Sequence, residues 1–361
     1  MDTPVAVCLG IASWKRRRIG DFLATGGARP VFRRTAGSAV RAAASRGGAL
    51  AVWASREPPE LAALARERGV ALVRLEDGFL RSVGLGSDFW PGLSIVVDRA
   101  GIHVDPSRDS DLECLLRDGS FDAALLARAR RLVDRLIAEG VTKYNLAGRM
   151  PRIAWPAGRR RLLVPGQVED DLSVRLGGGA VRGNLDLLAR VRAANPDAFI
   201  LYKPHPDVVA GHRRGALRES EIRRHADGVL RDAPIAALFG QIDELHTLTS
   251  LAGFEALLRR VPVTVYGRPF YAGWGLTHDV APCDRGRRLT LDELAAGALI
   301  LYPRYLDPMT RRRCEPETVL ERLAQPALWR PGPVIRLRRL QGRLVEALRA
   351  GPALAWPSAS R

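Results

Sequence analysis

Short apolar runs alternate with helical patterns along the first third of the chain. The runs have the length of buried strands, and they cover residues 5–11, 49–53, 70–75 and 93–97. Between them lie helical patterns such as 59–68, which begins with a proline and stops at Gly69. A longer helical pattern, with leucines at helical spacing, follows at 121–139. Strands that alternate with helices predict a parallel sheet with right-handed crossovers.

The alternation begins again after a proline-rich, basic stretch at 150–160. The strands predicted there are 161–164, 198–202, 243–248 and 261–265, and the helices are 183–194 and 250–258. We therefore predict an α/β fold of two Rossmann-like domains that face a central cleft, with residues 1–150 and 151–329 as the domains. Residues 330–361 are a basic tail whose amphipathic stretch predicts a surface helix, with a linker remnant and a membrane contact as alternatives.

The composition fits two cores and sets the expected compartment. A length of 361 residues with 47% hydrophobic content is enough for two domains. No apolar run approaches the roughly 20 residues that span a bilayer. The run at 5–11 precedes its basic residues, the reverse of a secretory signal, so we interpret it as a first strand. The cysteines have no metal-like spacing and are expected to be free thiols in a reducing cytoplasm; they are Cys8, Cys114, Cys283 and Cys314.

The formal net charge is +17, and arginine carries nearly all of the positive charge. Lysine occurs only at Lys15, Lys143 and Lys203, which suggests that a compact ammonium is needed there, with genomic base composition as the alternative explanation. The excess charge suits nucleic acid, an anionic membrane face or acidic small molecules. Aromatic residues make up only 6%, and none are interleaved with basic residues as a stacking platform. We therefore expect basic patches near a membrane surface and no nucleic-acid partner.

A cation and an imidazole follow the strand predicted at 198–202. Lys203 and His205 are each followed by a proline, which biases them to extended backbone and stiffens the loop. Open α/β sheets bind ligands at the carboxyl ends of their strands, so we expect both side chains at a ligand cleft. There they would neutralise charge that develops on a phosphate leaving group. The alternative is a loop whose histidine only caps local backbone.

A helix start follows the strand predicted at 243–248. Thr249 and Ser250 supply hydroxyls, and Ser250 is placed as the N-cap of a helix whose amino end suits an anion. Gly253 would let a ligand approach the first turn, and Glu255 would accept hydrogen bonds from two ribose hydroxyls. With the preceding loop, this pattern predicts a nucleotide held by its phosphate and its ribose. An ordinary capped helix with a surface glutamate is the alternative.

Two acidic groups also follow strands. Glu76 and Asp77 are adjacent, and paired carboxylates tend to raise the pKa of one member, which suits general acid or base chemistry. The alternative is a structural salt bridge to Arg81. The second group is the acidic run at 169–171, where a residue that reacts, one that binds hydroxyls, or a metal ligand would each fit. We expect no metal, because the cations near residue 203 already compensate charge.

The segment 266–275 is rich in glycine and aromatic residues and follows the strand predicted at 261–265. Aromatic faces pack well against sugars and bases, and Arg268 would pair with a carboxylate or phosphate. The alternative is a well-packed loop between the domains.

Taken in order, these motifs resemble the capsular polysaccharide biosynthesis proteins of the KpsC/LipA type. The likeness covers roughly residues 5–325, and its segments are 76–86, 143–146, 166–171, 202–206, 249–250, 267–275 and 301–308. The resemblance implies a GT-B-like fold and a β-Kdo glycosyltransferase that needs no cofactor. The family uses CMP-Kdo as donor and builds the Kdo linker between a lysophosphatidylglycerol anchor and a Gram-negative capsule.

The resemblance also implies roles for individual residues. His205 would contact the donor phosphate and Glu255 the ribose. Transfer in the family retains configuration, and the position that matches its proposed carboxylate nucleophile is Asp171. Glu76 or Asp77 would then be the acid/base or an acceptor-side carboxylate. The remaining residues expected to bind the donor are Gln167, Arg81, Lys203, Thr249, Ser250, Gly253 and Arg268.

One departure from the family pattern concerns the number of modules. Typical members carry two such modules in tandem, whereas this chain holds one. We therefore expect either half of a split pair, with a second transferase module or the capsule export machinery as partner, or a single-module relative with another acceptor. The resemblance places the protein in the cytoplasm, peripheral at the inner membrane, with a glycolipid acceptor. Two further hypotheses stay open at this point, namely a GT-B-fold nucleotide-sugar epimerase and a non-catalytic capsule export or assembly factor.

Overall fold

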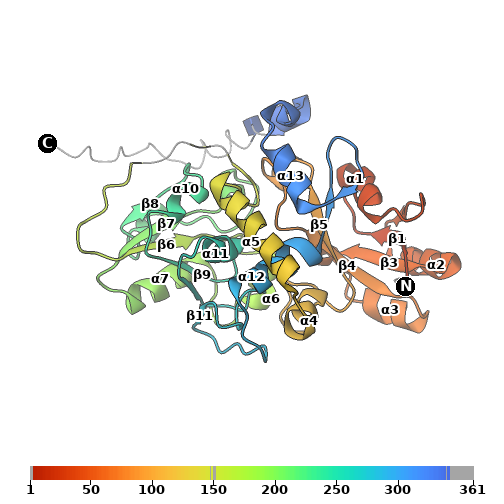
Figure 1. Cartoon of the computed structure of the whole chain (residues 1–361), viewed down its shortest axis with the longest axis horizontal. Coiled ribbons are helices and arrows are strands. Elements are labelled where there is room, and N and C mark those ends of the chain that lie inside the picture. Colours follow the sequence, from red (N-terminus) through yellow and green to blue (C-terminus); the bar gives the residue numbers. More distant parts are fainter. Residues whose placement is uncertain (1–2, 147, 149–151, 339, 342–361) are drawn as a thin grey trace.

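Two β-sheets, one built mainly from each half of the chain, form the framework of the protein. The computed structural model describes residues 3–146, 148, 152–338 and 340–341. Figure 1 shows the red and orange half of the ribbon beside the green and cyan half, with α5 (Ala123–Ala138) running diagonally between them. The α/β prediction is confirmed.

The first sheet has the strand order β13-β12-β5-β4-β3-β1-β2 within the described residues. Its strands are β1 (Val5–Leu9), β2 (Val31–Arg33), β3 (Ala49–Trp53), β4 (Leu72–Asp77), β5 (Ser94–Asp98), β12 (Pro303–Leu306) and β13 (Arg313–Cys314). β1 to β4 pair in parallel, whereas β5, β12 and β13 pair antiparallel with their neighbours. The expectation of a wholly parallel first sheet is therefore wrong. The link from β4 to β5 contains only a short turn, η2 (Gly86–Asp88), and parallel pairing needs a longer crossover.

The second sheet is parallel throughout, as the alternating pattern predicted. Its strand order is β11-β10-β9-β6-β7-β8 in the described part of the chain. The strands are β6 (Arg161–Pro165), β7 (Phe199–Lys203), β8 (Gly228–Val229), β9 (Glu244–Thr247), β10 (Val263–Val265) and β11 (His278–Asp279). β6, β7 and β9 lie side by side and end at the same edge of the sheet, so the loops after them converge there.

Helices connect the strands in both halves. Those of the first half are α1 (Ser13–Leu23), α2 (Ala36–Arg46), α3 (Leu61–Glu67), α4 (Asp111–Asp118) and α5. Those of the second half are α6 (Leu172–Gly177), α7 (Asn184–Ala194), α8 (Pro206–Val209), α9 (Glu219–Ile222), α10 (Ala236–Phe239), α11 (Leu251–Leu258) and α12 (Leu291–Ala295). α13 (Pro316–Leu323) follows β13 and packs against β12 and α5. Short 3₁₀ segments lie at η1 (Ala54–Arg56) and η4 (Pro326–Trp329), and a π-helical turn, η3 (Ala296–Leu301), follows α12.

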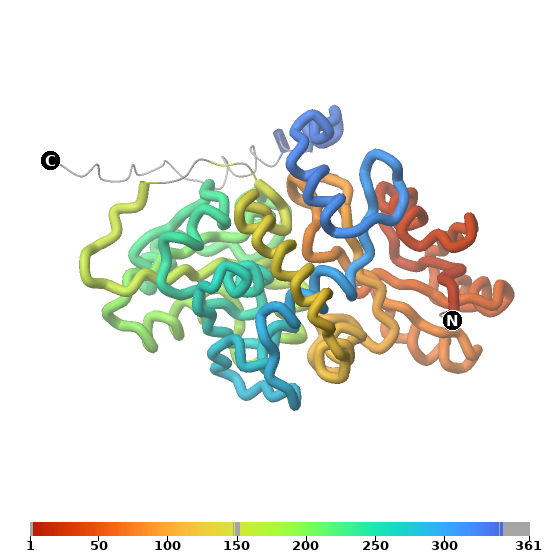
Figure 2. The backbone as a smooth tube through the Cα atoms, viewed as in Figure 1, coloured from red at the N-terminus to blue at the C-terminus, as the bar shows by residue number. Residues whose placement is uncertain are grey.

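The chain returns to its first half near the end. The blue tube in Figure 2 runs from the cyan half back to the orange half, where β12 and β13 extend the first sheet beside β5. Residues 303–314 thus belong to the sheet of the amino-terminal half, although the sequence pattern grouped them with residues 151–329. The predicted boundary between residues 150 and 151 lies outside the described residues.

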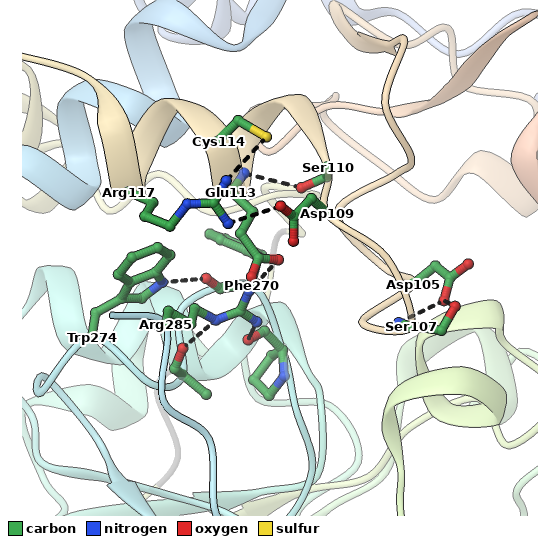
Figure 3. Close-up of polar contacts among 12 residues, drawn as sticks. Asp105, Ser107, Asp109, Ser110, Glu113, Cys114, Arg117, Phe270, Trp274 and Arg285 are labelled. Atoms are coloured by element: carbon green, nitrogen blue, oxygen red, sulfur yellow. Dashed lines mark hydrogen bonds and ion pairs between the residues drawn. The ribbon is translucent and has the colours of Figure 1, made fainter. Parts of the chain in front are cut away.

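One apolar core joins the two halves. α5 packs against α12, and a single cluster of buried side chains includes Leu132 of α5, Phe79 after β4 and Trp274 of the second half. Figure 3 shows polar contacts beside this core, where Glu113 of α4 pairs with Arg285 and Trp274 donates its indole N–H to the Phe270 carbonyl. The two halves are therefore fixed against each other on this side.

Three further expectations bear on the whole chain. All four cysteines are free, and Cys8 alone among them is buried. Among the described residues, no helix has both the length and the apolar character to cross a bilayer. The tail is helical at 333–338, but most of the predicted surface helix lies outside the described residues.

Candidate functional site

A cleft of about 590 Å³ lies between the two halves and takes side chains from both sheets. Its walls include all of the predicted site residues except Gly253. From the first half come Glu76, Asp77 and Arg81, and from the second half come Gln167, Asp171, Lys203, His205, Thr249, Ser250, Glu255 and Arg268. The structure thus brings together loops that are far apart in the sequence, as two sheets with facing carboxyl edges require.

Gly253 is the exception, and the predicted role for it is wrong. A Cβ atom at this position would lie 2.3 Å from the Tyr271 hydroxyl oxygen. That hydroxyl donates to the carbonyl of Ser250 at the start of α11. The glycine therefore makes room for a buried tyrosine that fixes the start of the helix, and it does not admit a ligand.

Replacing Gly253 by alanine is expected to destabilise the fold by about 1–3 kcal/mol through overpacking against Tyr271. Chemical denaturation of the purified variant measures this change. The matched control is Gly37→Ala in α2, where the nearest atom to a new Cβ is the end of a flexible arginine at 3.4 Å. The control is expected to be neutral or stabilising by up to about 1 kcal/mol. Equal stability of Gly253→Ala and the wild type would contradict the packing role.

His205 presents a hydrogen-bond donor to the cleft. Its Nδ1 accepts from the backbone N–H of Asp207 at 3.1 Å, as the N-cap of α8. Burial lowers the pKa of His205, so the ring is neutral and its proton lies on Nε2. Nδ1 therefore caps local backbone, which is the alternative that the sequence left open, and Nε2 carries the proton. The predicted phosphate contact of His205 remains a prediction.

Lys203 lies at the end of β7, next to His205 along the cleft wall. Its side chain is buried, and its Nζ donates to the carbonyl of Arg231 at 3.4 Å. Burial lowers the pKa of Lys203 to about 8. A buried ammonium has lost most of its hydration, so an anion that binds beside it stabilises its charge.

Gln167 and Thr249 link two loops of the second half of the cleft. The Gln167 amide donates to the Thr249 hydroxyl at 2.9 Å and accepts from the Thr249 backbone N–H at 2.9 Å. Ser250 is the N-cap of α11 and accepts from Ala252 at 3.2 Å, as predicted. Gln167 and Thr249 therefore hold the cleft wall in shape, and their predicted donor contacts remain predictions.

Glu255 links α11 to the segment that follows α5. One of its carboxylate oxygens accepts from the backbone N–H of Lys143 at 2.7 Å. Burial raises the pKa of Glu255, while this bond opposes the rise. The predicted contact of Glu255 with a ribose remains a prediction.

Asp171 is the N-cap of α6 and stands at the mouth of the β6 loop. Its Oδ1 accepts from the backbone N–H and the hydroxyl of Ser173, at 3.2 and 3.1 Å. The side chain is 46% exposed, with Arg213 4.0 Å from Oδ2. The negative charge of Asp171 contributes to raising the pKa values of Glu76 and Lys143, so it acts across the cleft on both groups. Asp171 is thus accessible, fixed in orientation and close to the acidic pair.

The surroundings of Glu76 and Asp77, at the end of β4, shift the pKa values of the two carboxyl groups in opposite directions. Burial and the adjacent Asp77 charge raise the pKa of Glu76 to about 7. Burial would also raise the pKa of Asp77, but Arg81 at 2.8 Å and Lys15 at 3.6 Å reverse the direction and hold it low. Glu76 is therefore the member that can exchange a proton near neutral pH.

Arg81 follows the structural alternative that the sequence left open. Its side chain is 1% exposed. Its guanidinium binds Asp77, the Ser82 hydroxyl at 2.9 Å and the Trp90 carbonyl at 3.4 Å. Arg81 thus holds the loop after β4 in position through Asp77, Ser82 and Trp90. Its predicted contact with the donor remains a prediction.

All three lysines of the chain line this one cleft. Lys203 was predicted as a site residue, whereas Lys15 and Lys143 were not assigned roles. Burial lowers the pKa of Lys143, but the charges of Tyr144, Asp77, Glu76 and Asp171 outweigh it and raise the pKa, so Lys143 is a half-buried cation facing the carboxylates. The retention of lysine in an arginine-rich chain was the signal that identified both residues.

In the aromatic segment after β10, some residues pack in the core and Arg268 lies at the edge of the cleft. Phe270, Tyr271 and Trp274 are buried in the shared core, which is the alternative of a packed interdomain loop. Arg268 is exposed at the cleft edge, where it donates to the Pro282 carbonyl at 3.2 Å. Within the described residues no group of three or more acidic, histidine or cysteine side chains is arranged to hold a metal.

Comparison with known proteins gives this arrangement a context. The sequence model described as "Capsule polysaccharide biosynthesis protein" matches residues 48–305. The chain belongs to this family. It is 41% identical over 315 residues to the capsule polysaccharide modification protein LipA of Neisseria meningitidis serogroup A, covering 87% of this chain and 44% of LipA. It is also 40% identical over 314 residues to the lipopolysaccharide-processing protein LpsZ of Rhizobium meliloti, covering 84% of this chain and 70% of LpsZ.

Two solved structures share the fold of this family member. One is the β-Kdo 2,4 transferase of Thermosulfurimonas dismutans KpsC, with a TM-score of 0.75 and 31% identity. The other is the β-Kdo 2,7 transferase of the same KpsC, with a TM-score of 0.72 and 35% identity. Each comparison covers 88% of this chain and 98% of the solved chain. The predicted GT-B-like fold and the KpsC/LipA resemblance are confirmed, and the chain spans less than half the length of LipA.

Proposed function

We propose that the protein is a glycosyltransferase that moves Kdo from CMP-Kdo to a glycolipid acceptor in capsular polysaccharide biosynthesis. The observation that carries the proposal is the cleft itself. Its second-half wall holds His205 and Lys203 for a phosphate, while Asp171 and Glu76 face its centre as an accessible carboxylate and one with a pKa of about 7. Similarity to two β-Kdo transferases supports the sugar, and CMP is the matching leaving group.

The donor is held by the second half. Nε2–H of His205 donates to the CMP phosphate, and the Lys203 ammonium neutralises its charge. Glu255 accepts from the ribose hydroxyls through Oε2, while Oε1 accepts from the backbone N–H of Lys143. This arrangement places the sugar toward the centre of the cleft, where the carboxylates lie.

Transfer takes two steps and retains configuration. In the first step an Asp171 oxygen bonds to the anomeric carbon while the bond from that carbon to the phosphate oxygen breaks, and CMP leaves with the electron pair. In the second step an acceptor hydroxyl gives its proton to the Glu76 carboxylate and bonds to the same carbon, while the Asp171 ester bond breaks. Burial and the negative charge of Asp77 raise the pKa of Glu76 to about 7, so Glu76 can accept a proton in this step.

The acceptor is a Kdo-bearing lipid or lysophosphatidylglycerol. The reaction needs no cofactor. The protein works in the cytoplasm at the inner membrane surface, which its basic patches contact, beside a second transferase module or the capsule export machinery.

Incubating the purified protein with CMP-Kdo and each acceptor tests the proposal. We expect stoichiometric CMP release and Kdo-lipid product, measured by chromatography and mass spectrometry. A changed sugar nucleotide formed without acceptor would instead indicate an epimerase. CMP binding without any product would indicate a non-catalytic assembly role.

A further inference from the structure

The turn at 142–145, which follows α5, joins the two halves of the protein at the wall of the cleft. The backbone N–H of Lys143 donates to Glu255 of α11 at 2.7 Å. The backbone carbonyl of Lys143 accepts from the N–H groups of Arg81 and Ser82, at 3.1 and 3.2 Å, in the loop after β4. A single residue thus bridges the helix proposed to contact the ribose and the loop that follows the two carboxylates of β4.

The side of the turn that faces α11 has a second fixed point. The Arg259 guanidinium donates to the carbonyl of Val141 at 2.8 Å and to the carbonyl of Glu255 at 3.0 Å. The loop after β4 has little structure of its own, since residues 78–93 contain only one short 3₁₀ turn, η2. Ordering so long a loop costs conformational entropy, which contacts outside the loop must offset. The bonds to Lys143 are such contacts.

The bridge reaches the carboxylate of Glu76 through two residues. The backbone of Arg81 is held by the Lys143 carbonyl, and the Arg81 guanidinium binds Asp77 at 2.8 Å. The backbone N–H of Asp77 donates in turn to Glu76 Oε1 at 2.9 Å. A displacement of the turn therefore moves the proposed base relative to the groups of the second half.

Asn145 fastens the turn to the loop after β4. Its Nδ2 donates to the Ser82 carbonyl at 3.0 Å, and its Oδ1 accepts from the N–H of Thr142 at 2.9 Å. Because one partner only accepts and the other only donates, both bonds need the two ends of an amide. The φ angle of Asn145 is 46°, in the left-handed region that asparagine tolerates better than most residues. Asn145 does not line the cleft, so both of its bonds serve the geometry of the turn.

We propose that Asn145 is a positioning residue for the second step of transfer. The first step uses Asp171 and the donor-binding groups, which belong to the second half. The second step also needs Glu76, which comes from the first half. Asn145 holds the turn that keeps Glu76 in reach of the acceptor hydroxyl while the sugar is bonded to Asp171. The inference rests on the proposed function, which supplies the two steps.

Rapid-quench kinetics with CMP-Kdo and a Kdo-bearing lipid tests this role. Asn145→Gly keeps the positive φ and removes both side-chain bonds. It is expected to release the first equivalent of CMP at the wild-type rate and to form product about 10- to 100-fold more slowly, the range for a displaced catalytic group. The ester of Kdo with Asp171 then accumulates, and mass spectrometry of the intact protein detects it. The affinity for CMP, measured by calorimetry, is expected to stay within about three-fold of the wild type.

Asn145→Asp is a second variant that isolates the bond to Ser82. An aspartate tolerates positive φ and accepts from Thr142, but it has no amide donor for the Ser82 carbonyl. It is expected to show the same slow second step. The matched control is Arg260→Gly, since Arg260 also has a positive φ, of 58°, is exposed and does not line the cleft. The control is expected to transfer Kdo like the wild type.

Hydrogen exchange measures the bridge without turnover. Peptides that contain Arg81 and Ser82 are expected to exchange faster in Asn145→Gly than in the wild type, because their N–H groups donate to Lys143. Unchanged exchange, wild-type product formation by either Asn145 variant, or an equal loss in CMP release and product formation overturns the positioning role. Faster exchange in a protein whose wild type releases no CMP overturns the proposed function and keeps Asn145 as the residue that holds the loop.

Discussion

Replacing Asp171 by asparagine is expected to lower kcat for Kdo transfer about a thousand-fold or more, because an amide cannot form the proposed ester with the sugar. Asparagine caps helices as well as aspartate does, so α6 keeps its N-cap and the fold is preserved. The affinity for CMP, measured by calorimetry, is expected to change little. The loss therefore falls on the chemical step, which single-turnover kinetics measures directly.

A matched control separates this effect from capping. Asp122 is the N-cap of α5, where it accepts from Leu125 at 2.7 Å, and it does not line the cleft. Asp122→Asn makes the same chemical change at a second helix start and is expected to leave kcat within about two-fold of wild type. If Asp171→Asn kept more than a tenth of the wild-type kcat, Asp171 would not be the nucleophile.

Replacing Glu76 by glutamine is expected to lower kcat about 10²- to 10⁴-fold and to remove the pH dependence of the reaction near neutrality. A general base acts in its ionised form, and the pKa of Glu76 is raised to about 7. The wild-type rate should therefore rise about ten-fold per pH unit below pH 7 and level off above it. The glutamine variant has no group to ionise, so its residual rate should be flat from pH 5.5 to 8. A pH series of kcat for both proteins measures the difference.

The variant Asp77→Asn tests whether the charge of Asp77 raises the pKa of Glu76. The Asp77 charge is the second cause of the raised pKa of Glu76 after burial, so its removal should move the rising limb toward lower pH. Arg81 and Lys15 keep their positions near Glu76 in this variant and act in the same direction. A limb that stays near pH 7 in Glu76→Gln would show that another group is the base.

The strands that present the donor site could be predicted from the sequence because their signals are local. β6, β7 and β9 are short apolar runs, and each is followed by its polar loop, so their residues and their common edge followed from pattern alone. The first sheet was harder, because β12 and β13 come from more than 200 residues further along the chain than β5. Pairing between segments so far apart leaves no periodic signal in either of them.

Individual side chains also differed in how far the sequence predicted their roles. The sequence placed Gly253, Arg81 and Gln167 at the ligand. The structure packs Tyr271 against Gly253, and it adds hydrogen bonds from Arg81 to Asp77 and from Gln167 to Thr249, while both of these residues line the cleft. The sequence signal, a polar or glycine residue just after a strand, was the same for two kinds of residue. One kind exposes its side chain to the cleft, and the other holds neighbouring segments in place. Only the position of the partner, which is remote in sequence for Gln167 and Gly253, separates the two groups.

The sequence by itself determined which chemical groups are present: a histidine and a lysine after one strand, carboxylates at strand ends, and three lysines in an arginine-rich chain. The tertiary structure decided which carboxylate of the pair has a pKa near neutrality, and that all three lysines face one cleft. The physical reason is that a pKa depends on burial and on charges within a few ångströms. Both are set by the packing of segments that the linear order keeps apart.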